Sequence, residues 1–153
     1  LGDPDGDELA AAYAALPETA FGDDEPFPLF VHTLLQLRDG ARGGATPRLG
    51  PYFDVVQAWN SDPSLFARCL AGALDFHLDE TRGSPGNAAV FDEPGVMLFP
   101  AEALAVRAIR RELDLPWPKV EHPLMFTNLV TMAPEGPWPT DSLLARIERA
   151  ADS

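Results

Sequence analysis

The chain has very little cysteine and no long apolar stretch. Its 153 residues include one cysteine, Cys69, so no disulfide can form within the chain and the fold does not depend on an oxidising compartment. No apolar run approaches the ~18 residues of a membrane-spanning helix, and residues 1–25 lack the positive and apolar regions of a signal peptide. We therefore expect a soluble, cytoplasmic protein.

Basic residues are also scarce. Lysine and arginine together number 11, against 24 aspartates and glutamates, which gives a net charge of −13 at pH 7. A chain this acidic is repelled by phosphate backbones and anionic lipids, so nucleic-acid binding and membrane binding are disfavoured. The acidity is compatible with a basic protein partner and equally with a role in solubility alone. All the basic residues but Lys119 are arginine, a bias typical of GC-rich bacterial genomes.

The rest of the composition is that of an ordinary globular protein, 46% apolar and 23% charged. The length fits one domain. The acid is unevenly spread, because residues 1–25 contain eight acidic side chains and no basic one. We expect residues 1–25 to form an acidic N-terminal arm with a short helix, its degree of order left open, and residues 26–153 to form a single helical domain.

The spacing of apolar residues predicts a mostly α fold, with about five or six helices in antiparallel pairs. The helices are expected at 8–16, 27–38, 51–60, 63–81, 100–113 and 140–151. The helix over 63–81 has the clearest start, because Asp62 is a good N-cap and Pro63 suits the first helical position. Residues 90–99 are compatible with a short β-hairpin or with an irregular link. Residues 124–132 are predicted to be a strand or a buried extended segment.

Two of these helices have polar residues whose exposure can be predicted. On the helix over 100–113, apolar residues form one face, and the opposite, solvent-facing side is expected to hold Arg107, Arg110 and Arg111. On the helix over 27–38, His32 is expected on the polar side. Both predictions follow from helical periodicity alone.

No motif for catalysis, for a cofactor or for a metal ion is recognisable. The glycine-rich stretch at 40–44 is not followed by Gly-Lys-Ser/Thr, as a phosphate-binding loop would be. The chain has no Gly-x-Ser-x-Gly and no His-Glu-x-x-His sequence. Cys69 lies on an apolar stripe, which is typical of a buried structural thiol. We predict no catalytic residue, no cofactor and no metal site.

Acidic residues gather around the end of the 63–81 helix. The candidate partner-binding residues are Asp75, Asp79, Glu80, Asp92 and Glu93. Asp75 and Asp79 share one helix face, whereas His77 points to nearly the opposite side, so these three cannot hold one metal ion. We expect His77 at the core edge, hydrogen-bonded to a backbone group. The acidic cluster is a solvated face or a docking surface, since general acid–base work would need a raised pKa in a pocket.

Three segments between residues 69 and 129 carry a family resemblance. They are Ala73-Leu74-Asp75-Phe76-His77, Phe99-Pro100-Ala101-Glu102-Ala103-Leu104-Ala105, and Leu115-Pro116 through Val120-Glu121-His122-Pro123-Leu124. In this order they resemble the mostly helical immunity proteins of bacterial polymorphic toxins. The resemblance implies a non-enzymatic inhibitor that binds a cognate toxin and occludes its active site. It implies no role for any individual residue.

The sequence therefore favours a non-enzymatic protein-binding domain, an immunity-type inhibitor whose partner is a cognate, basic toxin. Two other hypotheses stay open. One is a small helical ligand-binding domain or enzyme with a pocket near His77 and Trp59. The other is a regulatory or structural module of a longer chain, which would show a large exposed apolar patch.

Overall fold

The computed structural model describes residues 4–22, 26–40, 44–82 and 97–131. Within these ranges every regular element is a helix and none is a strand, which confirms the mostly α prediction. The α-helices are α1 (Pro4–Ala14), α2 (Pro26–Arg38), α3 (Phe53–Gln57), α4 (Pro63–Thr81), α5 (Ala101–Glu112) and α6 (Asn128–Thr131). The 3-10 helices are η1 (Glu18–Ala20), η2 (Pro47–Tyr52) and η3 (Pro123–Phe126). The helix predicted at 140–151 and most of the hairpin candidate at 90–99 lie outside the described residues.

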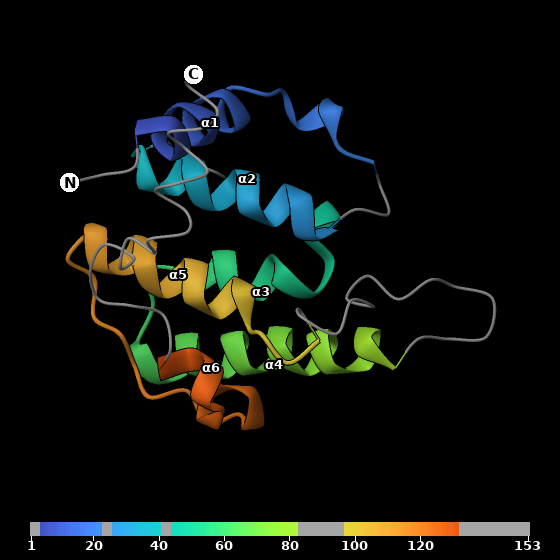
Figure 1. Cartoon of the computed structure of the whole chain (residues 1–153), viewed down its shortest axis with the longest axis vertical. Coiled ribbons are helices and arrows are strands. Elements are labelled where there is room, and N and C mark those ends of the chain that lie inside the picture. The colour runs from blue at the N-terminus through green and yellow to red at the C-terminus, as the bar shows by residue number, and fades with distance from the viewer. Residues whose placement is uncertain (1–3, 23–25, 41–43, 83–96, 132–153) are drawn as a thin grey trace, which may run out of the picture.

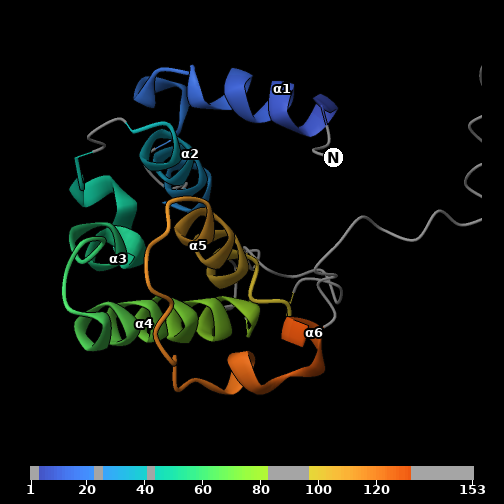
Figure 2. The same ribbon diagram turned by 90° about the vertical axis from the view of Figure 1, so that its left-hand side faces the viewer.

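The helices lie in successive layers, which Figure 1 and Figure 2 show from two sides. α1 lies against α2, and α2 lies beside α5 in both views. α3 and α5 lie between α2 and α4, and η3 and α6 lie on the far side of α4 from α2. No helix in the described ranges is both long and apolar enough to cross a membrane.

The core lies between α2, α4 and α5, with η2 contributing its centre. The fully buried ring of Tyr52 stacks on Phe30, with centroids 4.4 Å apart and planes 9° apart. The apolar side chains that are at most 1% exposed are Leu29, Phe30, Leu34, Leu49, Tyr52, Val55, Phe66, Leu70, Ala73, Leu74, Ala103 and Val106. Since each large one contributes about 1.5–3 kcal/mol on burial, this cluster is the main source of stability.

α4 begins where the sequence predicts. The carboxylate of Asp62 accepts hydrogen bonds from the backbone N–H groups of Ser64 at 2.9 Å and Leu65 at 3.4 Å. Pro63, at the first helical position, has no N–H that needs a partner. The inner face of the helix then repeats at helical spacing and buries Phe66, Leu70, Ala73, Leu74 and His77.

The other helix bounds agree less uniformly with the predictions. α2 and α5 match theirs to within one residue at each end, whereas α1 starts at Pro4 rather than at residue 8. In the region predicted as a helix over 51–60, Gly50 has a positive φ of 53° and breaks the helical stretch before Pro51. A turn then leads into α3, which ends at Gln57.

The prediction of a strand or extended segment over 124–132 is wrong for the described residues up to 131, which form η3 and α6. Local caps explain the difference. The Nδ1 atom of His122 accepts a hydrogen bond from the backbone N–H of Leu124 at 3.2 Å, and the hydroxyl of Thr127 donates to the carbonyl of Leu124 at 3.0 Å. These bonds stabilise a tight turn that overrides the β propensity of the apolar residues.

The prediction that His32 lies on the polar side of its helix is wrong, because its side chain is fully buried. Its Nε2 atom lies 2.8 Å from the carbonyl oxygen of Leu16 and 3.2 Å from that of Ala14. The last carbonyls of a helix have no partner within the helix, so the imidazole satisfies the end of α1. Together with a hydrogen bond of 3.2 Å from the Tyr13 hydroxyl to the carbonyl of Pro28, this contact holds α1 on α2.

Candidate functional site

The outer face of α4 is the side of that helix opposite the buried stripe. Its exposed residues recur every three or four positions and are Leu65, Arg68, Gly72, Asp75, Asp79 and Arg82, the last at the C-cap. The buried residues of α4 determine which positions form this outer face, because the residues that pack on α3 and α5 leave the remaining positions in solvent. Two of the five candidate residues, Asp75 and Asp79, lie on it.

Asp75 and Asp79 project into solvent, with side chains 75% and 72% exposed. The carboxylate of Asp79 forms an ion pair of 3.0 Å with Arg82. An Asp75 oxygen lies 3.3 Å from Nε2 of His122, which carries the proton of the neutral ring because Nδ1 accepts the bond from Leu124. Asp79 and Arg82 are both exposed, so their pair contributes about 0–1 kcal/mol. His122, by contrast, is buried beneath Asp75. Both carboxylates nevertheless project into solvent, where a partner can reach them.

The other candidate residues are not brought onto this face. Glu80 is half-buried, and its charge, after burial and Glu102, helps to raise the pKa of Tyr52 in the core. Asp92 and Glu93 lie outside the described residues. The structure thus brings together Asp75 and Asp79 on the outer face of α4 and leaves Glu80 half-buried beside it.

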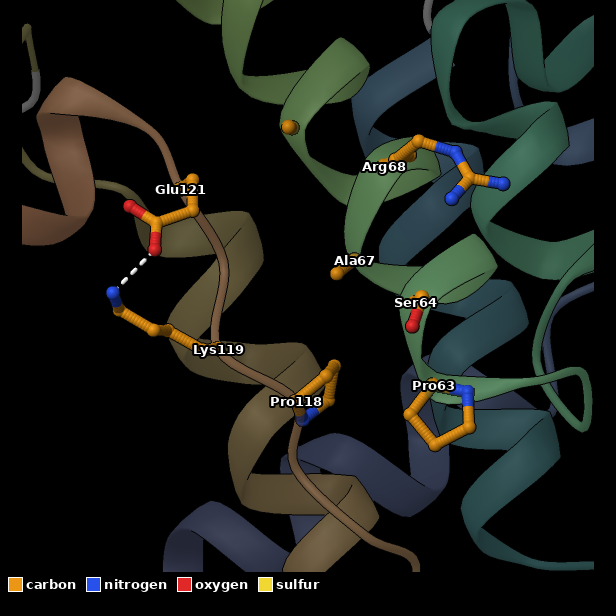
Figure 3. A pocket seen from close by; sticks show the side chains of 8 residues that line it. Pro63, Ser64, Ala67, Arg68, Pro118, Lys119 and Glu121 are labelled. Atoms are coloured by element: carbon orange, nitrogen blue, oxygen red, sulfur yellow. Dashed lines mark ion pairs between the residues drawn. The ribbon is translucent and has the colours of Figure 1, made fainter.

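An open groove runs along the N-terminal half of α4. It has a volume of about 520 Å³, lies between α4 and the chain segment before η3, and is lined by Pro63, Ser64, Ala67, Arg68, Ala71, Pro118, Lys119 and Glu121. Figure 3 shows Pro63 and Pro118 on opposite sides of the groove, and Lys119 paired with Glu121. This groove could not be predicted from the sequence, because its two walls are about fifty residues apart in the chain.

His77 and Glu102 form a buried pair that links α4 to α5. Their side chains are both fully buried, and Nδ1 of His77 lies 2.8 Å from a Glu102 oxygen. The other ring nitrogen lies 3.1 Å from the carbonyl oxygen of Met97. Since a carbonyl only accepts, that nitrogen carries a hydrogen, and one further proton lies between His77 and Glu102. The sequence predicts a hydrogen bond from His77 to a backbone group, but it does not predict the contact between His77 and Glu102.

Arg110 is buried, so the prediction that it lies on the solvent side is wrong. Only 2% of the residue is exposed, and burial lowers the pKa of its guanidinium. It donates to the carbonyl of Trp59 at 2.6 Å and to that of Pro116 at 3.2 and 3.0 Å, and it lies 4.0 Å over the ring of Phe66. These two carbonyls have no other hydrogen-bond donor among the described residues, and the guanidinium satisfies both of them.

The described residues contain no cluster of three or more His, Cys, Asp or Glu side chains that could hold a metal ion. Cys69 is half-buried against the core, and burial raises the pKa of its thiol, which disfavours the reactive thiolate. Comparisons of the chain with protein-family models, curated proteins and solved structures found no match.

Proposed function

We propose that this chain is a non-enzymatic protein-binding domain of the immunity type, which binds and neutralises a cognate, basic toxin in the bacterial cytoplasm. The observation that carries the proposal is the pair of exposed carboxylates, Asp75 and Asp79, on the outer face of α4 in a chain with a net charge of −13. The resemblance described above gives the class of partner.

The pair is well suited to recognise a basic surface. Asp75 and Asp79 are one turn apart on a 19-residue helix whose inner face is buried, so their positions are fixed before binding. Two like charges at this spacing repel each other by about 0.2–0.5 kcal/mol, and a partner's lysine or arginine would relieve that repulsion. The negative charge of the whole chain would also speed the encounter with a basic protein.

The alternative of a ligand-binding or catalytic pocket near His77 and Trp59 has less support. His77 is fully buried between Glu102 and Met97, and Trp59 is 4% exposed. The groove beside α4 is lined by neither of them. A buried histidine without access for substrate holds helices together rather than moving protons to a ligand.

The antiparallel pairing of neighbouring helices belongs to the same proposal. The connection between α3 and α4 spans residues 58–62, and connections this short favour antiparallel neighbours. Such pairing would hold α4 in one orientation within a rigid body, as a docking surface requires.

The test begins with a tagged chain used to capture its partner from the native host, washed at low and at high salt. The captured protein is identified by mass spectrometry and assayed for toxicity with and without the chain. The affinity of the captured protein is then measured for two variants of the chain. One is Asp75→Lys/Asp79→Lys, and the other is a control of equal charge change, Glu8→Lys/Glu112→Lys.

We expect the Asp75→Lys/Asp79→Lys variant to lose about 10- to 100-fold in affinity and much of the salt dependence. The control should lose far less, because Glu8 on α1 and Glu112 on α5 lie on other helices. Equal losses in the two variants would show that only total charge matters. A captured protein whose activity the chain leaves unchanged would overturn the inhibitor proposal itself.

A further inference from the structure

The segment of residues 117–121, which forms one wall of the groove, is extended and alternates in exposure like a β-strand. Val120 is buried, whereas Lys119 and Glu121 are exposed on the other side. Pro118 restricts Trp117, the first residue of the segment, to an extended conformation. In Figure 2 the chain between α5 and η3 runs across α4 without forming a helix.

The backbone of this segment is unpaired within the described part of the chain. Among the described residues, none accepts a hydrogen bond from the backbone N–H groups of Lys119, Val120 or Glu121. A row of free backbone donors and acceptors is a template for a further strand. Pro118 has no N–H, and Lys119 is charged, and natural edge strands use both features to limit unselective pairing.

The facing wall provides room for the side chains of such a strand. Ala67 and Ala71 lie one turn apart on α4, and their small side chains leave space in the groove. Pro63 and Pro118 form its apolar edges. The volume of about 520 Å³ lies within the range of about 300–1,000 Å³ that is usual for binding sites. The groove is therefore bounded by a helix on one side and by an unpaired extended backbone on the other.

Arg68 gives the groove a charge preference. Its side chain is exposed, and no hydrogen bond or ion pair to another described residue holds its guanidinium. In Figure 3 the guanidinium extends away from Lys119 and Glu121, so the side chain would have to rotate to meet a ligand in the groove. Lys119, by contrast, is already paired with Glu121. An unpaired guanidinium in a chain this acidic selects an acidic group.

We propose that the groove binds an extended segment of a partner protein, which adds as a β-strand to residues 119–121 and places an acidic side chain against Arg68. This inference goes beyond the proposed function, because it assigns a second contact on α4 with the opposite charge preference to Asp75 and Asp79. A partner that used both contacts would have a basic patch next to an acidic extended loop.

The test uses a random heptapeptide library displayed on phage, selected on the full chain and counter-selected on the Arg68→Glu variant. Enriched peptides are synthesised, and their binding is followed by amide chemical shifts and by calorimetry. We expect an acidic residue at one fixed position and shift changes centred on Lys119, Val120, Glu121 and Ala67. Arg68→Glu should weaken binding at least about 10-fold, and Arg111→Glu, an exposed arginine outside the groove, should not.

N-methylation of the peptides tests the strand addition itself. Methylating alternate amides in one register should abolish binding, and methylating the other register should leave it unchanged, because a strand donates to one neighbour from every second residue. No enriched peptide, binding that survives both methylations, or enrichment of basic peptides would each overturn the proposal. The peptides are selected on the chain alone, without the toxin, so this result stands or falls separately from the toxin-binding proposal.

Discussion

α4 and α5 are helices of the same small core, but their buried faces differ in kind. The inner face of α4 is apolar except for His77. The buried face of α5 contains Ala103, Val106 and Ile109 together with two charged residues, Glu102 and Arg110. The bounds of both helices are predicted closely by the sequence, whereas the buried face is predicted only for α4.

This contrast shows where hydrophobic periodicity fails to predict the buried face of a helix. The buried face of α5 includes Glu102 and Arg110, so a pattern drawn from its apolar residues alone points to a face that is rotated from the real one. The real face is held by specific polar contacts, namely His77 to Glu102 and Arg110 to two backbone carbonyls. A helix of this kind should tolerate substitution of its buried polar residues poorly.

Removing Arg110 should have the largest effect. Arg110→Ala leaves the carbonyls of Trp59 and Pro116 without donors and opens a cavity beside Phe66, which should cost about 3–5 kcal/mol of unfolding free energy. Urea denaturation measures the change. Arg107→Ala on the same helix is the control, since Arg107 has one long bond of 3.4 Å to the carbonyl of Val130 and should cost less than about 1 kcal/mol.

Equal losses of stability in these two variants would mean that Arg110 is no more buried than Arg107. The buried face of α5 would then not differ in kind from that of α4. A third variant, Arg110→Met, keeps most of the volume without the donors. Its stability should fall between those of the original chain and Arg110→Ala. The difference between the methionine and alanine variants separates the packing of the side chain from its hydrogen bonds.

Removing Glu102 should have the next largest effect. Glu102→Ala deprives the buried Nδ1 of His77 of its partner, and we expect a loss of about 2–4 kcal/mol. The loss should be smaller than for Arg110→Ala, because one ring nitrogen loses its partner instead of two backbone carbonyls. Glu102→Gln, which keeps a polar partner, should lose less. Glu112→Ala, at the exposed end of α5, should change stability by less than about 0.5 kcal/mol, and a similar loss there would contradict the assignment.

Tyr52 interacts electrostatically with one carboxylate on α4 and one on α5. We therefore expect the stability of the chain to depend on pH in the alkaline range. Burial, then the charges of Glu102 and Glu80, raises the pKa of Tyr52 above its ordinary value. The unfolded chain therefore releases this proton first, near pH 10, and above that pH the original chain should lose about 1.4 kcal/mol of stability per pH unit from this group. Below pH 10 the group should contribute no pH dependence.

Tyr52→Phe should abolish that alkaline loss and change stability at pH 7 little, because the hydroxyl has no hydrogen-bond partner among the described residues. Denaturation of both chains between pH 8 and pH 11 measures the difference in slope. Tyr13→Phe serves as the control, since the Tyr13 hydroxyl is only partly buried. Equal slopes for the original chain and Tyr52→Phe would show that Tyr52 reaches solvent.

The parts of the fold that the sequence predicts are those decided by near neighbours. Asp62 and Pro63 start α4 through contacts within three residues, and Asp75 and Asp79 share its outer face because of helical geometry alone. Periodicity wrongly predicts His32 on the polar side, because its partner, the carbonyl of Leu16, lies just after the end of another helix. The same holds for Arg110 and Trp59, which are 51 residues apart. Contacts of that range leave no periodic signal.

The candidate site shows the same division. Periodicity correctly groups Asp75 with Asp79, but it gives no sign that Glu80 is half-buried or that a groove opens beside Ala67. The groove exists because an extended segment far along the chain lies across the small residues of α4. One signal was available in the sequence. Glu102 is one turn from Val106 and two from Ile109, so choosing Val106 as the centre of the buried face would have placed the glutamate inside.

Gly72 gives the smallest effect and tests the outer face of α4 alone. It is exposed in the middle of the helix, and a Cβ built there would meet no atom within 4 Å. Gly72→Ala should therefore raise stability by about 0.5–1 kcal/mol, through helix propensity alone. Gly40→Ala is the matched control, because Gly40 has a φ of +78° that alanine adopts with strain, and it should lower stability by about 1 kcal/mol. Thermal unfolding of both variants measures the two shifts. If Gly72→Ala instead destabilised the chain, another part of the protein would have to lie over α4, and its outer face would not be the free surface on which partner binding depends.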